Sequence, residues 1–479
     1  MLWHRLPKSI YFRRGAMATA MEELKDFKRA CIVTDKFLYN NTPYVHELTD
    51  LLKARDIECQ IFYEVQADPT LTTIRKGTDV LDNFQPGKCY LYISVSTLEI
   101  TKLILYTTIF SDLIVAIGGG SPMDAAKMMW VLHEHPDVDF KELALRFMDI
   151  RKRIFHFPKM GTKAQLVCIP TTSGTGSEVT PFAVVTDDST GMKYPLADYE
   201  LTPFMAIVDA NLVMMMPKGL TAAGGIDAVT HSIEAYVSVL ANEFSDGQAL
   251  QALKLLKQYL PRAYKNGAND PIAREKVHNA ATVAGIAFAN SFLGVCHSMA
   301  HKIGAEFHIP HGIANALVLT NTIRYNATNL PTKQTAFSQY DRPNALRRYG
   351  EIALHLGFNH LHTADRVNAM LEWLDNLKRD LDIPMSIQEY GVNEQEFLAK
   401  VDKIAVDAFD DQCTGANPRY PLISELKSIL ITSYYGRAYV EEYERIPMKP
   451  NLSSDSFAFL EHHQDEKLSQ DHSDTVNES

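Results

Sequence analysis

The fold is decided by the stretch Asp112-Leu-Ile-Val-Ala-Ile-Gly-Gly-Gly-Ser-Pro-Met-Asp-Ala-Ala-Lys127. Its first seven residues form an almost continuous apolar run, which is typical of a strand at the centre of a parallel sheet. The three glycines at its end, Gly118 to Gly120, permit a tight backbone turn, and the residues after them open a helical pattern. The stretch therefore predicts a buried strand that leads directly into a helix.

The sequence around this stretch repeats the alternation of strand and helix. Short β-rich runs alternate with helical patterns at residues 30–35, 44–55, 58–63, 71–84 and 165–169. This order is typical of a layered α/β domain, which we expect over residues 1–203. Helical periodicities dominate residues 204–448, the last of them at 422–442, and predict an all-helical second domain. The polar tail 449–479 is predicted to be disordered.

Two glycine-rich turns in the first domain are candidate dinucleotide sites. The turn that begins at Gly118 places free backbone amides at a helix N-terminus, where partial positive charge favours a pyrophosphate. The second turn is Pro170-Thr-Thr-Ser-Gly-Thr-Gly-Ser-Glu178, which offers hydroxyls to phosphate, ribose or nicotinamide. Neither turn has the GxGxxG pattern, and either one is also compatible with a purely structural turn. Asp35, at a predicted strand end, is expected to accept from a ribose hydroxyl and to favour NAD over NADP.

Side chains with metal-ligand spacing occur in the second domain. Asp227 and His231 are four residues apart in a helical pattern, so their side chains lie on one helix face. His297 and His301 repeat this spacing, and His311 stands between Pro and Gly, at a predicted turn or helix start. A mixed set of imidazoles and a carboxylate suits Fe, Zn or Ni better than Mg or Ca.

The alternative to a metal site is that these histidines are ordinary buried core residues. A single histidine on a buried helix face is more often a core residue than a ligand, and one such pair would be weak evidence. Two pairs together with a His-Gly turn favour the metal. The segment holds more histidines than four ligands require, and we expect His301 and His308 to be the extra ones. The predicted fold class is thus an α/β N-terminal dinucleotide-binding domain followed by an all-helical metal-binding domain.

Composition limits the class of protein. The 479-residue chain is 46% hydrophobic and 22% charged, as is usual for a globular protein, and its net charge of −11 argues against nucleic acid as a partner. No apolar run reaches membrane-spanning length, so no membrane partner is expected. Six cysteines without framework spacing predict reduced thiols and a cytoplasmic location. Residues 1–21 are basic enough for a transit peptide, but residues 7–15 favour a first strand that ends in a glycine turn.

Longer segments resemble a known family. The sequences Gly225-Ile-Asp-Ala-Val-Thr-His-Ser-Ile-Glu-Ala-Tyr236, Cys296-His-Ser-Met-Ala-His-Lys-Ile-Gly-Ala305 and Pro310-His-Gly-Ile-Ala-Asn315 are similar to those of the iron-dependent (group III) alcohol dehydrogenases. Segments 148–154, 193–203 and 410–421 resemble, more narrowly, the alcohol dehydrogenase half of the bifunctional aldehyde-alcohol dehydrogenases of fermentative organisms. Apart from one block, the resemblance covers roughly residues 6–445.

The resemblance implies roles for individual residues. The metal ligands would be Asp227, His231, His297 and His311, and His301 would lie close to substrate and nicotinamide. We therefore take His301 as the candidate catalytic residue that passes a proton, with packing or support of a ligand as its alternative roles. Lys193 is equally compatible with a solvated hairpin. The implied NAD(H) contacts are Gly118, Gly119, Gly120, Ser121, Asp124, Thr171, Thr172, Thr175 and Lys193.

The predicted function follows from this resemblance. We expect an NAD-dependent, Fe(II)-dependent enzyme that interconverts a short-chain aldehyde, acetaldehyde, and its alcohol, ethanol, in fermentation. Zn(II) is the alternative ion. The partners implied are the small-molecule substrate, a second copy of the chain in a homodimer, and an aldehyde dehydrogenase half in a higher assembly. The alternative functions are a Zn-dependent polyol dehydrogenase or dehydroquinate synthase relative of the same fold, or a mainly structural fragment of a bifunctional enzyme.

The block that departs from the resemblance is residues 87–111. Without it the chain would read Gln-Pro-Asp-Leu-Ile-Val-Ala-Ile-Gly-Gly-Gly, as in the family. Gly87-Lys88 can be encoded by a splice-donor sequence, and Phe110-Ser111-Asp112 by a splice acceptor. We interpret the block as a translated intron, which requires GGT at Gly87 and a codon ending in A at Ser111. The alternative is a true surface insertion, which loops tolerate at modest cost, although this one is apolar and β-prone.

Overall fold

The computed structural model describes residues 4–84, 112–144, 157–328 and 344–440. Three predicted features lie outside these ranges: the insertion 87–111, the segment 148–154 and the tail 449–479. The predicted end of the second domain, residue 448, also lies outside these ranges and stays a prediction.

A six-stranded parallel sheet forms the centre of the first domain, with strands in the order β1-β8-β5-β4-β2-β3. Every residue of β4 is buried, and β4 pairs with β2 on one side and with β5 on the other. The apolar run at 112–118 is therefore a central strand, as predicted. The strands are β1 (Ser9–Phe12), β2 (Arg29–Asp35), β3 (Glu58–Val65), β4 (Asp112–Gly118), β5 (Ala164–Pro170) and β8 (Met205–Val208).

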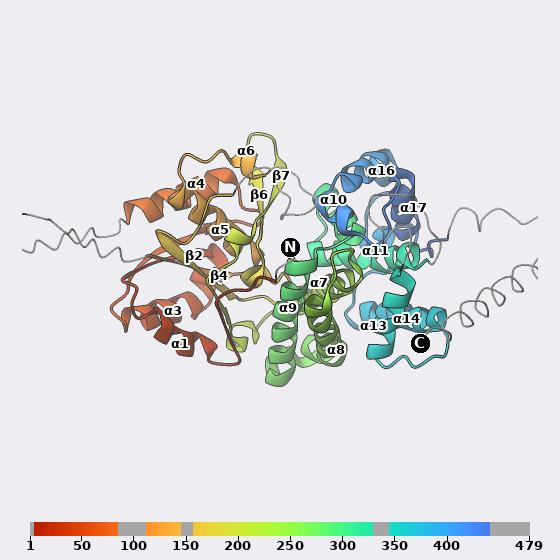
Figure 1. The fold of residues 1–479 in the computed structure, drawn as a ribbon, viewed down its shortest axis with the longest axis horizontal. Helices are drawn as coiled ribbons and strands as arrows, with labels where there is room; N and C mark the ends of the chain where they lie inside the picture. The colour runs from red at the N-terminus through yellow and green to blue at the C-terminus, as the bar shows by residue number, and fades with distance from the viewer. Residues whose placement is uncertain (1–3, 85–111, 145–156, 329–343, 441–479) are drawn as a thin grey trace, which may run out of the picture. The chain divides into compact units, whose positions relative to one another are not determined.

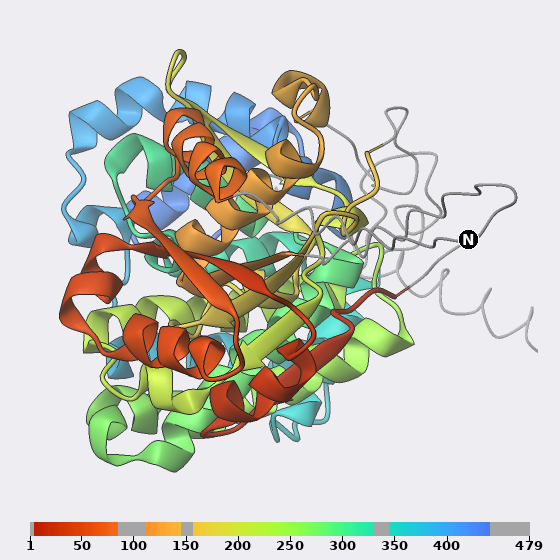
Figure 2. The ribbon, with the colours of Figure 1, turned by 90° about the vertical axis from the view of Figure 1, so that its left-hand side faces the viewer.

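Helices cover both faces of this sheet (Figures 1 and 2). On one face, α4 and α5 pack with the apolar side chains of Cys31, Ile114 and Leu166. On the other face, α1 and α3 pack with Ile32 and Val115. A separate hairpin, β6 (Phe182–Asp187) and β7 (Met192–Ala197), lies against α5. The helices here are α1 (Ala16–Ala20), α2 (Lys36–Asn41), α3 (Tyr44–Lys53), α4 (Leu71–Asn83), α5 (Gly120–Glu134) and α6 (Phe140–Leu143).

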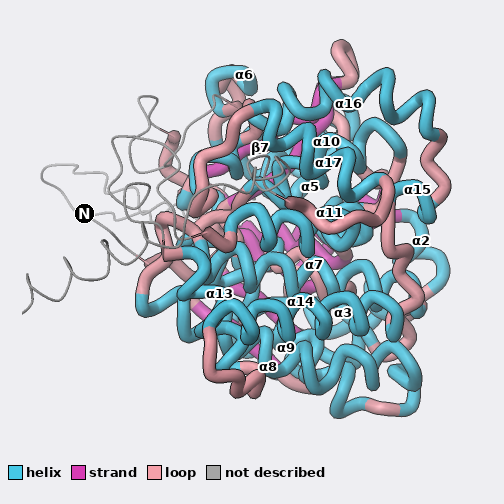
Figure 3. Tube along the Cα trace, turned by 90° about the vertical axis from the view of Figure 1, so that its right-hand side faces the viewer, coloured by secondary structure: helices cyan, strands magenta, loops and turns pink. Residues whose placement is uncertain are grey.

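From Lys218 onward, every regular element of the described residues is a helix, and one large apolar core holds these helices together (Figures 1 and 3). Strand β8 lies just past the predicted boundary at residue 203 but pairs in the sheet, so the sheet extends beyond that boundary. The final helix is shorter than the pattern at 422–442 predicts. It ends at Tyr434, shortly before Gly436 adopts a positive φ of 64°. The helices are α7 (Lys218–Val237), α8 (Glu243–Asn266), α9 (Pro271–Ser291), α10 (Val295–Phe307), α11 (His311–Asn326), α13 (Ala345–His355), α14 (Thr363–Asp380), α15 (Ile387–Tyr390), α16 (Glu394–Phe409) and α17 (Ile423–Tyr434).

Close backbone contacts join the sheet domain to the helices. A Cβ atom on Gly174 would lie 2.6 Å from the Cα of Gly224 in α7, and one on Gly176 would lie 2.6 Å from the Cα of Gly285 in α9. Only glycine permits such an approach, so these positions hold the second glycine-rich turn against the helical domain.

In the described part of the chain, no helix is by itself both long and apolar enough to cross a membrane. Only α9 and α10 taken together, across a bend of 110°, have the length and composition to do so.

Candidate functional site

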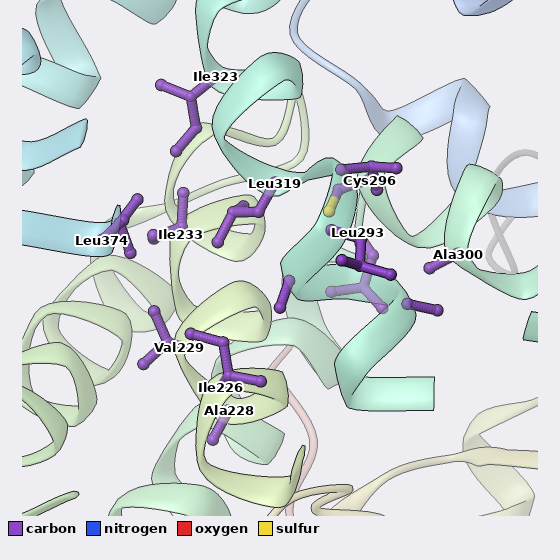
Figure 4. Close-up of a cluster of buried hydrophobic side chains, with 14 of the residues drawn as sticks. Ile226, Ala228, Val229, Ile233, Leu293, Cys296, Ala300, Leu319, Ile323 and Leu374 are labelled. Carbon is purple, nitrogen blue, oxygen red and sulfur yellow. The ribbon is translucent and has the colours of Figure 1, made fainter. Parts of the chain in front are cut away.

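Helix α7 carries two stripes of side chains, and both are buried. Ile226, Val229 and Ile233 form an apolar stripe that packs with Leu319 and Ile323 of α11 in the helical core (Figure 4). The neighbouring stripe is polar: Asp227, His231 and Glu234 recur at helical spacing and are each 3% exposed. The apolar packing therefore fixes α7 in an orientation that buries three ionisable side chains.

The four predicted ligands converge on one point. The Oδ1 atom of Asp227 lies 3.7 Å from Nε2 of His231, 3.6 Å from Nε2 of His297 and 3.4 Å from Nε2 of His311. The ligand atoms of all four residues lie within 4.8 Å of one another. His297 comes from α10, and His311 is the first residue of α11, so the predicted helix start is confirmed.

The spacing and the environment of these atoms fit a metal ion. Four ligand atoms in a tetrahedron about 2.1 Å from one ion lie about 3.4 Å apart, close to the separations seen here. The Nδ1 atom of His231 is buried and has no hydrogen-bond partner among the described residues. Burial lowers the pKa of His231 to about 3, which leaves its ring neutral and able to donate a lone pair.

The charges within the cluster are strongly coupled. Burial by itself would raise the pKa of Asp227, but the neighbouring imidazoles lower it well below its usual range. Burial likewise opposes the charged form of His297, but the carboxylates of Glu234 and Asp227 outweigh burial and raise the pKa of His297 to about 9. A cation bound at Nε2 of His297 would therefore displace a proton.

Asn315 of α11 also faces the ligand atoms. Its amide nitrogen Nδ2 lies 2.8 Å from Oδ1 of Asp227 and 3.0 Å from Nε2 of His297. The contact with Asp227 requires the amide nitrogen rather than the amide oxygen on this side, because two oxygens would repel each other. Asn315 is therefore placed to hold the carboxylate of Asp227 in position.

His301 lies beside the cluster but outside the group of four. Its ring stacks on that of His311 with centroids 5.4 Å apart, and its side chain is 33% exposed. Its Nδ1 is 3.1 Å from Oδ2 of Asp411, which also pairs with Lys302 at 2.8 Å. His308 ends α10 in the left-handed conformation and also lies outside the group.

The two predicted dinucleotide turns lie side by side. They follow the adjacent strands β4 and β5, and the N–H of Thr171 donates to the carbonyl oxygen of Gly118 at 2.8 Å. A Cβ atom on Gly119 would touch Thr172 at 3.5 Å, and one on Gly120 would touch Thr175 at 3.3 Å. Both turns therefore present backbone amides and hydroxyls at the same edge of the sheet, where ligands of parallel sheets bind.

Two charged residues of α5, the helix that follows the first turn, form hydrogen bonds with residues 177–184. Asp124 accepts from Oγ of Ser177 and from the N–H of Val184. Lys127 is fully buried and donates to the carbonyl oxygens of Ser177, Thr180 and Phe182 at 2.7–2.9 Å. These contacts fix the segment that follows the second turn. The predicted cofactor contact of Asp124 stays a prediction, and Ser121 is partly exposed at the start of α5.

The remaining two predicted cofactor residues have partners of their own. One carboxylate oxygen of Asp35 caps α2 by accepting from the N–H of Leu38 at 2.9 Å. Lys193 forms an exposed ion pair with Asp68 at 2.8 Å. Its positive charge is also among the groups that lower the pKa of His311, after burial of that imidazole. Lys193 is therefore near enough to the metal cluster to influence it.

Glu234, Asn315 and Asp411 contact the site but were not among the residues predicted from the sequence. Glu234 follows Asp227 by seven residues and His231 by three, so helical spacing already places it on their face. Asn315 follows His311 by four residues, so helical spacing likewise places it on the same face as that ligand. Asp411 lies 110 residues from His301 and no local pattern links the two.

Comparison with known proteins settles the family. A model described as iron-containing alcohol dehydrogenase matches residues 7–88 and 100–210, and a model of the C-terminal part of the Fe-containing alcohol dehydrogenase family matches residues 221–434. The chain belongs to the iron-containing alcohol dehydrogenase family. It is thus an enzyme of the alcohol dehydrogenase type, as predicted. The first match is interrupted at residues 89–99, inside the predicted insertion.

Two curated relatives differ in length. The chain is 64% identical over 445 residues to the bifunctional aldehyde-alcohol dehydrogenase of Escherichia coli K12, which covers 92% of the chain and 47% of that protein. It therefore spans about half the length of this relative. It is 38% identical to the NADPH-dependent butanol dehydrogenase of Clostridium saccharobutylicum, over 91% of the chain and 99% of that protein.

Solved structures of this family have the same fold. A 1,3-propanediol oxidoreductase matches with a TM-score of 0.76 and 29% identity, over 91% of this chain and all of that one. The iron-containing alcohol dehydrogenase from Thermococcus thioreducens matches with a TM-score of 0.75 and 30% identity over the same shares. The predicted fold class, an α/β domain followed by a helical domain, is confirmed.

Proposed function

We propose that this chain interconverts a short-chain aldehyde, preferably acetaldehyde, and its primary alcohol, with NAD(H) as hydride carrier and Fe(II) as metal. The observation that carries this proposal is the convergence of three Nε2 atoms on Oδ1 of Asp227. A carboxylate and three imidazoles make a site for a divalent transition ion. The identity of 64% to a bifunctional aldehyde-alcohol dehydrogenase supports the choice of substrate.

Different residues would bind the metal ion and the dinucleotide. Asp227, His231, His297 and His311 would hold the ion, which when bound supplies Lewis acidity to a carbonyl or alkoxide oxygen. Backbone amides at Gly118–Gly120 and the hydroxyls of the neighbouring turn orient the dinucleotide at the sheet edge.

His301 is the proposed proton carrier. The contact of Nδ1 with Asp411 fixes its ring, and its partial exposure gives a path to solvent. Asp411 therefore orients this imidazole, as carboxylates commonly do for catalytic histidines.

The choice of NAD over NADP rests on Asp35. A carboxylate at the end of β2 repels a 2′-phosphate and accepts from a ribose hydroxyl. One relative is named for NADPH dependence, so a comparison of kcat/KM for NADH and NADPH tests this choice.

We further propose that the chain is cytoplasmic, forms a homodimer and works beside an aldehyde dehydrogenase activity that supplies its aldehyde. Two relatives of about twice its length are named as aldehyde-alcohol dehydrogenases, one of them as bifunctional, which supports the last point. Light scattering on the purified chain tests the dimer.

Anaerobic NADH oxidation tests the proposed function. Protein stripped of metal is reloaded with Fe(II) or Zn(II) and assayed with acetaldehyde, butanal and a polyol. We expect activity with Fe(II) and acetaldehyde that is lost on chelation. Metal-loaded, folded protein that oxidises NADH with none of the aldehydes would refute the proposal, and activity with Zn(II) and a polyol would favour the alternative enzyme.

A further inference from the structure

Glu234 is a buried carboxylate directly behind one metal ligand. It is 3% exposed, and its Oε2 lies 2.5 Å from Nδ1 of His297, while Nε2 of the same ring faces Asp227. Its Oε1 accepts from the N–H of Cys296 at 2.8 Å. Both oxygens are thus used on Cys296 and His297, two consecutive residues in the first turn of α10.

The space for this carboxylate is provided by a glycine. A Cβ atom on Gly294 would lie 2.9 Å from Oε1 of Glu234 and 2.6 Å from Oδ1 of Asn417. Any larger residue at 294 would displace the carboxylate or the amide. The chain therefore leaves room for Glu234 at the point where α10 begins.

The charge of Glu234 is paired with an imidazole, that of His297. Across the described ranges, no lysine or arginine forms an ion pair with Glu234, and its recorded ion pair is with His297. Asp411 behind His301 differs, because Lys302 shares it at 2.8 Å. A buried carboxylate is costly without compensation, so the negative charge of Glu234 acts mainly on His297.

We propose that Glu234 is a positioning residue that sets the strength of the metal site through His297. By accepting from Nδ1–H, it fixes the tautomer in which Nε2 carries the lone pair, and it makes that nitrogen a stronger donor. The extra electron density at Nε2 also stabilises the higher oxidation state of a bound iron ion. This inference rests on the proposed metal site.

A set of three variants tests this inference. Glu234→Gln keeps the shape and an acceptor but removes the charge, and Glu234→Asp keeps the charge but shortens its reach. Glu134→Gln is the matched control, because Glu134 is 5% exposed and accepts from Trp130 and from the 161–164 turn, away from the ligands. Anaerobic titration with Fe(II) and Co(II) gives the dissociation constants, and redox titration gives the Fe(III)/Fe(II) midpoint.

The expected outcome is specific to Glu234. Metal binding by Glu234→Gln should weaken by about 10- to 100-fold, its Fe(III)/Fe(II) midpoint should become more positive, and Glu134→Gln should match the unsubstituted protein. The metal affinity and the midpoint of Glu234→Asp should lie between those of Glu234→Gln and those of the unsubstituted protein.

Other outcomes separate the possible failures. If the unsubstituted protein binds no Fe(II), the proposed function fails and this inference fails with it. If it binds Fe(II) and Glu234→Gln binds equally well at the same midpoint, only this inference is overturned. An equal loss in Glu134→Gln also overturns it, because the effect would then be general destabilisation. If Glu234→Gln does not fold, an unchanged affinity in Glu234→Asp overturns it.

Discussion

The metal cluster and the dinucleotide turns depend on opposite properties of the chain. The cluster is built from large side chains that converge in a buried space, and Asp227, His231 and His297 are each almost inaccessible. The dinucleotide turns depend on glycines, which have no side chain. In the second turn, Gly174 and Gly176 lie so close to the backbones of α7 and α9 that a Cβ atom would not fit. The first region should therefore fail when atoms are removed, and the second when atoms are added.

The largest effect should come from removing a ligand. His297→Ala should lose bound metal and activity together, by about 10³-fold or more in kcat/KM, because several kcal/mol of Lewis-acid stabilisation disappears. Metal analysis and NADH oxidation measure both. His278→Ala removes an equally buried histidine outside the cluster and should keep its metal. Retained metal in His297→Ala would contradict the ligand assignment.

Removing His301 should separate rate from metal. His301→Ala should keep its metal and lose about 10²-fold in kcat, the lower range for general acid–base catalysis. The measurement is metal content beside steady-state kinetics. Loss of metal in this variant would show that His301 supports a ligand, and our role assignment would be wrong.

Adding one carbon should damage the second region alone. Gly176→Ala places a Cβ against the Cα of Gly285 at a φ of 64°, which should displace the turn at a cost of about 1–3 kcal/mol. We expect dinucleotide binding to weaken by about 10- to 100-fold, at unchanged metal affinity, in a fluorescence titration with NADH.

Gly219→Ala is the control for this comparison, because a Cβ at that position of α7 would have no atom within 4 Å apart from its chain neighbours and the backbone of its own helix. It should raise the free energy of unfolding by about 0.4–1 kcal/mol without changing either site. Equal NADH binding in Gly176→Ala and Gly219→Ala would break the comparison between the two regions.

A smaller effect should follow from neutralising Asp35. Asp35→Asn retains the cap on Leu38 and removes the charge, so the ratio of kcat/KM for NADPH to that for NADH should rise about fivefold to tenfold. An unchanged ratio would remove Asp35 from the cofactor site.

The smallest effect on either site should come from deleting residues 87–111. Phe84 and Asp112, the described residues on either side of this block, are both close to Arg29. Arg29 donates to the carbonyl oxygen of Phe84 at 2.7 Å and interacts with the charge of Asp112. The remaining Gln85 and Pro86 should then join α4 to β4. We expect unchanged metal and NADH affinities and a higher soluble yield; a deletion that no longer folds would count against the intron hypothesis.

The sequence predicted what depends on local periodicity. The strand at 112–118 and the paired spacings at 227/231 and 297/301 follow from period and turn residues, and the structure has them where expected. Glu234 was not predicted because a charged residue in a helix is usually solvent-facing, and its contacts with Cys296 and His297 of α10 depend on tertiary structure. Asp411 escaped because its contact with His301 depends on tertiary structure alone.

Because α7 carries an apolar and a polar stripe side by side, the number of residues between Asp227 and Glu234 cannot change without loss of the metal site. A single residue inserted after Asp227 would rotate the rest of the helix by about 100°. His231 and Glu234 would leave the ligand side, and their places would be taken by Thr230, which has no imidazole, and by Ile233, which has no polar side-chain atom. In an evolutionary series, this window of α7 should therefore tolerate substitution on its other faces but no change of length, whereas the surface loops should vary in length freely.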